Sequence, residues 1–226
     1  MTSTTSDRGE GPPSPLEAAA AALGVPLSSH QIEGLLRYLD LLQRWNATYN
    51  LTAIRDEQGM VTHHLVDCLS VIGPLRRQLS GARAGARILD AGSGGGLPGV
   101  LIALLQPEWD VTCVDAVGKK AAFVRQVAGE LRLANLHAAH ARLEQCRAAQ
   151  FDLVTARAFA SLLDLTRLTE ALLKPGGCWM AMKGQTPADE MAALPPEIEV
   201  FHVEPLTVPG LDAQRCLVWM RRRSDS

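Results

Sequence analysis

The 226-residue sequence lacks most of the features that mark secreted, membrane-spanning or zinc-stabilised proteins. Its five cysteines are an odd number and include no CxxC pair, which argues against a disulfide framework and against a structural zinc site. No apolar run reaches the roughly 18 to 20 residues that span a bilayer, and the N-terminal stretch lacks a cationic start followed by an apolar block. We therefore expect a reduced, cytoplasmic protein with no metal site and no contact with a membrane.

A strong charge of either sign is also missing, because the formal net charge is only −2. That charge is too small for nucleic-acid binding by bulk attraction, so any contact with RNA would need local basic groups. The candidates are Arg37, Arg44, Arg55, Lys119, Lys120, Arg125 and Arg221–Arg223. With 47% hydrophobic residues the chain can bury a full core, which favours one main domain with a helical extension.

The N-terminal part of the sequence predicts a tail followed by helices. Residues 1–15 are rich in Ser, Thr, Gly and Pro, and cannot bury enough surface to offset the entropy of ordering. The sequence Ser14-Pro15-Leu16-Glu17 is a capping box with proline at the first helical position, and it predicts a short helix that Gly24 ends. Ser28 begins a longer helix, because apolar residues recur after it at helical spacing. A third helix is expected to stop at Gly73-Pro74.

From Arg87 onward the pattern changes to short apolar strands that alternate with helices. The strand candidates are Ile88–Ala91, Val111–Asp115, Leu136–Ala139, Asp152–Thr155, Cys178–Lys183, Glu199–Val203 and Cys216–Met220. The alternation predicts an α/β, Rossmann-like fold with a mostly parallel seven-stranded sheet, whose last two strands form a hairpin at the sheet edge. We expect a disordered tail over 1–15, a helical cap over 16–80 and the Rossmann-like domain over 81–223.

The most informative segment is Ile88-Leu89-Asp90-Ala91-Gly92-Ser93-Gly94-Gly95-Gly96-Leu97-Pro98-Gly99, in which a strand runs through glycines into a helix. Glycines allow the backbone to turn sharply and a ligand to come close. One reading is the G-x-G-x-x-G loop of dinucleotide enzymes, in which the helix start binds a pyrophosphate. The other is a loop for S-adenosylmethionine, which carries a sulfonium cation and no phosphate. The carboxylate of Asp90 would oppose a pyrophosphate and tolerate the cation, so it favours S-adenosylmethionine.

Asp115 supports a nucleotide ligand of either kind. It ends the second strand candidate, 21 residues after Gly94, at the spacing where a carboxylate can accept hydrogen bonds from ribose hydroxyls. Both NAD and S-adenosylmethionine contain that ribose. The plainer alternative is that the glycines form only a tight turn and that Asp115 only caps the next helix.

The glycine loop resembles that of the bacterial small-subunit rRNA guanine-N(7) methyltransferase G family, also called glucose-inhibited division protein B. Further segments that resemble the family are Trp45-Asn46, Tyr49-Asn50-Leu51-Thr52, His64-Leu65-Val66-Asp67, Asp115 with Gly118-Lys119-Lys120 and Phe123, Arg157-Ala158-Phe159-Ala160-Ser161, and Lys183-Gly184-Gln185. The resemblance extends in colinear order over about residues 28–220. It implies methyl transfer from S-adenosylmethionine to a guanine of 16S rRNA, in the small ribosomal subunit or its RNA, by a protein that we expect to be monomeric.

The resemblance also implies roles for individual residues. Gly92 and Leu97 would contact the cofactor, Leu143 and Glu144 would lie by the adenine, and Arg157 would be a cofactor-side or RNA-side residue. Ala116 stands where the family pattern suggests a small hydroxyl residue, which puts one peripheral hydrogen bond in doubt. The predicted cofactor-binding set is Asp90, Gly92, Gly94, Gly96, Leu97, Asp115, Ala116, Leu143, Glu144 and Arg157, and Arg157 is the residue predicted to be catalytic.

Guanine nitrogen-7 carries an in-plane lone pair, so its methylation needs no general base and depends on positioning and charge stabilisation. The sequence lacks the Asn/Asp-Pro-Pro-aromatic loop typical of amino-group methylation, having Ala156-Arg157-Ala158-Phe159 at that place. None of the five cysteines follows a proline, which argues against covalent pyrimidine methylation. Methylation of another RNA site or a small molecule stays open, as do an NAD-dependent oxidoreductase and a non-enzymatic nucleotide-binding partner of RNA.

Three side chains have alternative interpretations. Arg157 could be part of a buried structural ion pair instead of the site. Phe159 could stack on an RNA base or lie in the apolar core. His64 and Asp67, with Cys68 at i+4 from the histidine, could begin a metal site, but a histidine hydrogen-bonded between the helices and the sheet is favoured.

Overall fold

The computed structural model describes residues 13–54, 56–80, 85–146 and 150–223. Most of the predicted tail over 1–15, the basic residue Arg55 and the segment 81–84 at the expected domain boundary therefore lie outside the described residues. Within the part that is described, none of the helices has both the length and the apolar character needed to cross a membrane.

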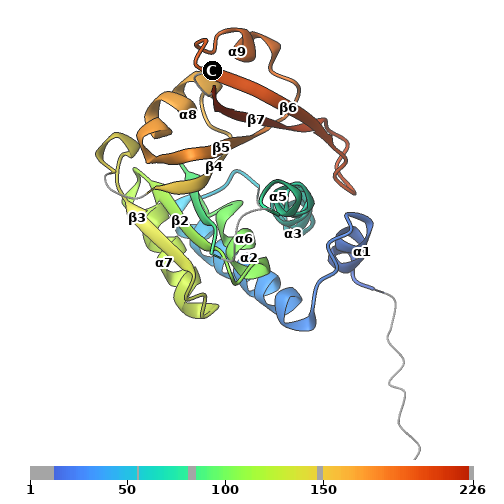
Figure 1. Cartoon of the computed structure of the whole chain (residues 1–226). Coiled ribbons are helices and arrows are strands. Elements are labelled where there is room, and N and C mark those ends of the chain that lie inside the picture. The colour runs from blue at the N-terminus through green and yellow to red at the C-terminus, as the bar shows by residue number, and fades with distance from the viewer. Residues whose placement is uncertain (1–12, 55, 81–84, 147–149, 224–226) are drawn as a thin grey trace, which may run out of the picture.

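The centre of the molecule is a seven-stranded sheet in the order β3-β2-β1-β4-β5-β7-β6 (Figure 1). The strands are β1 (Arg87–Ala91), β2 (Asp110–Asp115), β3 (Leu136–His140), β4 (Phe151–Arg157), β5 (Leu173–Lys183), β6 (Ile198–Leu206) and β7 (Arg215–Arg222). Strands β1 to β5 pair in parallel, and β7 runs antiparallel between β5 and β6. The predicted α/β fold, the mostly parallel sheet and the hairpin at its edge are confirmed.

The chain changes direction across the sheet between β1 and β4. From β1 it proceeds through β2 to β3 on one side, and β4 then returns to pair with the opposite side of β1. In open parallel sheets such a switch point leaves a crevice at the carboxyl ends of the strands, where ligands bind. The ends of β1 and β4, at Ala91 and Arg157, are therefore the place to look for a site.

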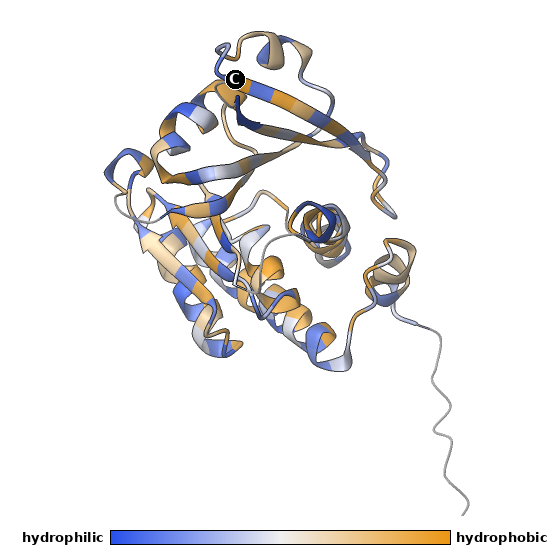
Figure 2. Cartoon of the chain, in the orientation of Figure 1, coloured by the Kyte–Doolittle hydropathy of each residue, from blue (hydrophilic) through white to orange (hydrophobic). Residues whose placement is uncertain are grey.

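Helices cover both faces of this sheet. The helices that follow strands are α6 (Gly99–Leu105), α7 (Gly118–Glu130), α8 (Leu162–Thr169) and α9 (Ala188–Ala192), with 3-10 turns η2 (Leu143–Gln145) and η3 (Glu170–Leu172). One apolar cluster joins the sheet to α6, α7 and the N-terminal helices, and a second joins its other face to α8. Every residue of α6 is buried, and Figure 2 shows this helix as almost wholly apolar.

The N-terminal helices begin at the predicted places, after Ser14 and Ser28. Helices α1 (Pro15–Ala22) and α2 (Ser29–Tyr49) each start after a serine whose side chain accepts the N3 amide hydrogen bond, while the N3 side chain bonds back. Helix α2 lies along α6 and α7, and the indole Nε1 of Trp45 donates to Gln126 Oε1 at 3.0 Å. This contact fixes the C-terminal part of α2 against the sheet domain.

The prediction that a helix stops at Gly73-Pro74 was wrong. The segment consists of α3 (Glu57–Met60), the π-helical turn η1 (Val61–Val66), α4 (Asp67–Leu69) and α5 (Ile72–Gln78). Both residues lie in the first turn of α5, where proline is tolerated because its missing N–H would have no partner within the helix. A proline signal thus marked a helix start instead of an end.

Candidate active site

The loop after β1 is held against the end of β2. The amides of Gly92 and Ser93 both donate to the carbonyl of Val114, at 2.9 and 3.1 Å. Gly94 has a left-handed φ of +57°, and a Cβ placed on it would meet no atom within 4 Å, so the backbone here faces open space. A Cβ on Gly96 (φ +83°) would instead lie 2.6 Å from the side chain of Val100. Glycine is therefore needed at position 96 because the loop packs closely on α6.

Asp90 lies behind this loop and is fully buried. Its Oδ2 accepts the amide hydrogen of Gly99, the first residue of α6, at 2.9 Å, whereas Oδ1 has no hydrogen-bond partner among the described residues. Burial raises the pKa of Asp90 to about 7. The side chain therefore fixes the start of α6 to β1, and it does not line either of the cavities described next.

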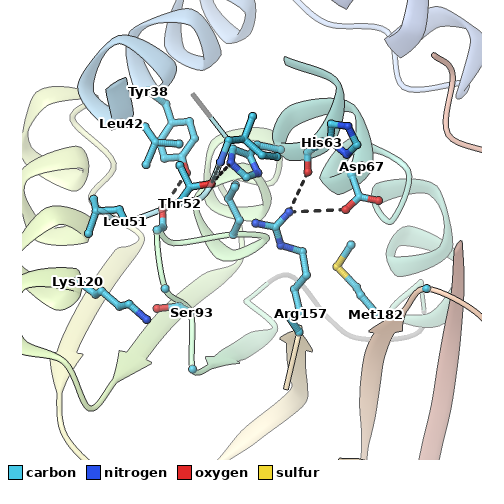
Figure 3. Close-up of a pocket in the computed structure, with 18 of the residues that line it drawn as sticks. Tyr38, Leu42, Leu51, Thr52, His63, Asp67, Ser93, Lys120, Arg157 and Met182 are labelled. Atoms are coloured by element: carbon cyan, nitrogen blue, oxygen red, sulfur yellow. Dashed lines mark hydrogen bonds and ion pairs between the residues drawn. The ribbon is translucent and has the colours of Figure 1, made fainter. Parts of the chain in front are cut away.

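The larger cavity, of about 600 Å³, lies between the glycine loop and the N-terminal helices (Figure 3). Its lining from the sheet domain consists of Gly92, Ser93, Gly94, Gly95, Leu97, Lys120, Arg157, Ala158, Met182, Lys183, Gly184 and Arg215. Its lining from the N-terminal region consists of Tyr38, Leu42, Leu51, Thr52, Ile54, His63, His64 and Asp67. Of the predicted cofactor-binding set, Gly92, Gly94, Leu97 and Arg157 meet here.

A smaller cavity, of about 280 Å³, adjoins the first and shares Gly92 with it. Its other lining residues are Val114, Asp115, Ala116, Ala141, Arg142, Leu143, Glu144 and Phe159. The residues that were predicted to lie by the ribose and the adenine are thus brought together. Phe159, which could have stacked on RNA, lies at this cavity instead, with its ring next to Gly92. Gly96, like Asp90, lines neither cavity.

Asp115 connects the glycine loop to the start of α7. Its Oδ2 accepts the amide hydrogen of Gly94 at 3.0 Å, and its Oδ1 accepts that of Val117 at 2.8 Å. The ammonium of Lys120 lies 3.7 Å from Oδ2. Because a carboxylate has about four lone-pair positions, it can hold both amides and still accept hydrogen bonds from a ligand.

Arg157 reaches from the end of β4 into the larger cavity. Its Nη1 donates to the carbonyl of His63 at 3.0 Å and lies 3.6 Å from Oδ2 of Asp67 (Figure 3). The other oxygen of Asp67 accepts from Nε of Arg215 at 2.9 Å. Burial works to lower the pKa of Arg157, but neighbouring acidic groups, first Cys68 and then Asp67, raise it overall. Arg157 therefore forms the buried ion pair and also lines the cavity, so both interpretations of this residue hold. It is a permanent cation at the cavity wall.

His64 is part of a hydrogen-bonded corner. Its Nε2 lies 2.9 Å from Oγ1 of Thr52, and burial, with the charge of Arg157 adding to it, lowers the pKa of His64 to about 4. The ring is thus neutral at physiological pH. No group of three His, Cys, Asp or Glu side chains suited to a metal ion occurs among the described residues, and Asp67 is engaged by the arginines.

Two residues of α2 that are absent from the predicted site support the cavity, Tyr38 in its lining and Asn46 behind it. The hydroxyl of Tyr38 donates to the carbonyl of Gly95 at 2.8 Å, which ties α2 to the glycine loop. The side chain of Asn46 accepts from the amide of Thr52 at 2.9 Å and donates to the carbonyl of Ile54. Tyr38 sits at helical spacing among apolar residues, so its pattern indicates only core, and the sequence gives no local signal for its hydrogen bond.

The geometry separates the two readings of the glycine loop. A pyrophosphate would need free amides at a helix start, but the first amide of α6 is already bound by Asp90 and α6 is buried throughout. The open space above Gly94, the acid of Asp115 and the apolar walls of the smaller cavity fit a nucleoside with no phosphate. These residues therefore fit the adenosine and amino-acid parts of S-adenosylmethionine.

Comparisons with known proteins agree with this geometry. The family model for rRNA small subunit methyltransferase G (GidB) matches residues 31–218. A protein named ribosomal RNA small subunit methyltransferase G from Leptothrix cholodnii is 62% identical over 209 residues, 92% of this chain and 95% of that protein. The protein of that name from Bordetella avium is 56% identical over 207 residues, 92% of each chain.

Solved structures show the fold. The crystal structure of TrmN from Thermus thermophilus has a TM-score of 0.56 and 24% identity, and covers 69% of this chain and 49% of that one. A SAM-dependent methyltransferase from Aquifex aeolicus has a TM-score of 0.52 and 14% identity, and covers 73% and 94%. At these identities the likeness is one of fold alone.

Proposed function

The chain belongs to the rRNA small subunit methyltransferase G family, and on that premise we propose that it transfers a methyl group from S-adenosylmethionine to nitrogen-7 of a guanine in 16S rRNA. The observation that carries the proposal is the pair of cavities joined at Gly92, in a chain whose family model spans residues 31–218. The protein would act in the cytoplasm, as a monomer, on the small ribosomal subunit or its RNA.

The cofactor-binding residues follow from the two cavities. Asp115 would accept hydrogen bonds from the ribose, and Ala116, Leu143 and Glu144 would surround the adenine. Gly92 and Gly94 would let the amino-acid end pass close to the backbone into the larger cavity. Asp90 and Gly96 would act indirectly, by holding the loop and α6 in place.

When bound, S-adenosylmethionine supplies a methyl group on a positively charged sulfur, which the in-plane lone pair of guanine nitrogen-7 can attack without first losing a proton. The chain therefore needs no general base, and its task is to orient the base and to exclude water. A neutral His64 and a permanently charged Arg157 suit that task, since neither exchanges a proton near pH 7. Arg157, fixed by Asp67 and the carbonyl of His63, would hold a cofactor carboxylate or an RNA phosphate.

The proposal is tested by transfer of labelled methyl groups to rRNA. Small subunits and naked 16S rRNA from cells lacking the protein are incubated with the purified chain and labelled S-adenosylmethionine, and the nucleosides are separated. We expect label in 7-methylguanosine alone. Label in another nucleoside would move the activity to another RNA site. No transfer, combined with nicotinamide-cofactor binding in a calorimetric titration, would instead support the oxidoreductase alternative.

A further inference from the structure

At one edge of the larger cavity the C-terminal end of α2 meets the start of α7. Leu51 and Lys120 line the cavity and lie on the same side of it in Figure 3. Tyr49 lies two residues before Leu51, and Lys119 is the neighbour of Lys120. The ammonium of Lys119 donates to the carbonyl of Tyr49 at 2.9 Å and lies 6.0 Å from the centre of its ring. We call these two side chains, which lie next in the chain to lining residues but do not line the cavity themselves, the Tyr49–Lys119 platform.

The ring of Tyr49 is exposed but not loose. Its exposure is 42%, and the other large apolar side chains that are exposed among the described residues are Leu36, Val117 and Leu163. Single exposed apolar residues are common on soluble proteins. This one differs because its ring lies 5.0 Å from that of Trp45, which packs on Phe123 and is hydrogen-bonded to Gln126. A ring held in this way loses little conformational freedom when it stacks on a ligand.

In the part of the chain that is described, the cation of the platform, unlike the arginines of α2, is not paired with an acid. Elsewhere on α2, Arg37 and Arg44 are neutralised by ion pairs with Asp40, and Arg37 also with Glu130. Among the described residues, Lys119 has no carboxylate within 4 Å. An aromatic surface and an uncompensated cation thus stand together beside the cavity, a combination that suits an aromatic and anionic partner.

The proposed reaction implies what that partner is. Nitrogen-7 of guanine lies on the major-groove edge, and in helical RNA this groove is too deep and narrow for side chains to read. The target guanosine must therefore be unstacked to enter the cavity, which leaves its neighbour without a stacking partner. We propose that the Tyr49–Lys119 platform is an RNA-docking surface, on which the base next to the target guanosine stacks while Lys119 contacts its phosphate. This inference rests on the proposed function.

Direct binding tests the platform independently of catalysis. Fluorescence anisotropy with a labelled single-stranded RNA oligonucleotide is compared for the wild-type protein, Tyr49→Ala, Tyr49→Leu and Tyr49→Phe. Because stacking on an aromatic ring contributes appreciably per base, Tyr49→Ala should raise the Kd for RNA about tenfold. Tyr49→Leu should bind equally weakly, since it keeps apolar bulk without a π-face, and Tyr49→Phe should recover most of the affinity. The Kd for S-adenosylmethionine, measured by calorimetry, should stay at the wild-type value in all three variants.

The matched control is Leu36→Ala, which removes another exposed apolar side chain from α2 and should leave RNA binding at the wild-type level. Lys119→Gln should lower the slope of log Kd against log salt by about the amount that one phosphate contact contributes. Equal RNA affinity of Tyr49→Ala and the wild type would overturn the platform. A loss confined to assembled subunits and absent with naked RNA would also overturn it, since the ring would then contact a ribosomal protein. A loss of RNA binding in a protein that methylates no rRNA would contradict the proposed function and leave the platform standing.

Discussion

The two cavities that meet at Gly92 are built in different ways. The smaller one is formed by residues at the ends of β1, β2, β3 and β4, close to the strands that position them. The larger one combines the glycine loop with residues of α2, the segment after α2, η1, α4, α7, β4, β5 and β7, and it closes only when the N-terminal helices pack on the sheet. The comparison teaches that the smaller cavity, proposed for the adenosine, is specified by local sequence, whereas the larger cavity, proposed for the amino-acid end and the acceptor base, is specified by long-range contacts.

The largest expected effect is that of replacing Asp115, which lines only the smaller cavity. Replacing it by alanine removes the acceptor for the amides of Gly94 and Val117 as well as the predicted ribose contact. We expect the Kd for S-adenosylmethionine to rise about 100-fold, because charge-assisted hydrogen bonds are the strong ones, while RNA affinity is unchanged. Isothermal titration calorimetry measures the first and anisotropy the second. Asp110→Ala, which removes a half-buried acid at the other end of the same strand, is the control, and equal cofactor affinity in both variants would remove Asp115 from the site.

More of the lining of the smaller cavity than of the larger one could be picked out from the sequence, for a physical reason. Glycines at a strand end, an acid at the next strand end and period-two apolar runs are signals within short windows. The contact between Asp67 and Arg215 joins residues 148 positions apart, and no local pattern encodes it. The hydrogen bond between Asn46 and the amide of Thr52 is likewise not encoded by a local pattern. The same holds for the hydrogen bond of the Tyr38 hydroxyl, because periodicity can only assign Tyr38 to the core.

The next effect in size is that of a substitution in the larger cavity, at Asp67. Asp67→Asn keeps the shape of the side chain but leaves Arg157 and Arg215 facing each other without a compensating negative charge. We expect kcat/KM for the RNA substrate to fall about 30-fold, or about 2 kcal/mol, and the Kd for S-adenosylmethionine to rise by a smaller factor, because Arg157 lies on the path proposed for the amino-acid end of the cofactor. Steady-state methylation assays measure the fall. Asp164→Asn, at an exposed ion pair on α8, should have no effect, and a similar loss in both variants would contradict the positioning role.

A smaller effect is expected where the two regions are joined. Tyr38→Phe removes the hydroxyl that binds the carbonyl of Gly95, and leaves that carbonyl without its partner. The cost of one lost hydrogen bond of this kind is about 1 kcal/mol, so we expect a Kd for S-adenosylmethionine about fivefold higher and a comparable fall in kcat/KM for RNA. If only one of the two quantities changed, α2 would not connect the cavities through the loop.

The last effect concerns stability instead of affinity or rate, and is a pH dependence that comes from behind the loop. Burial raises the pKa of Asp90 to about 7, so the folded protein binds its proton more tightly than the unfolded chain does. This contribution to stability is present below about pH 4 and is lost as the pH rises to about 7. His64, whose pKa is lowered to about 4, contributes with the opposite sign between about pH 4 and 6.5.

Comparing Asp90→Asn with the wild type cancels the His64 contribution, which both proteins share. We expect the stability difference between the two proteins, from urea unfolding at pH 5, 6, 7 and 8, to shift in favour of the variant as the pH rises to 7 and to level off above it. A difference that is constant with pH would show that the carboxylate of Asp90 titrates normally.

The most direct measurement of the central claim is a crystal structure of the protein with S-adenosylhomocysteine, the product form of the cofactor. The account predicts the adenine against Ala116 and Leu143, the ribose hydroxyls on Asp115, and the amino-acid end crossing Gly92 toward Arg157. A nucleoside bound elsewhere, or a ribose that makes no contact with Asp115, would contradict it.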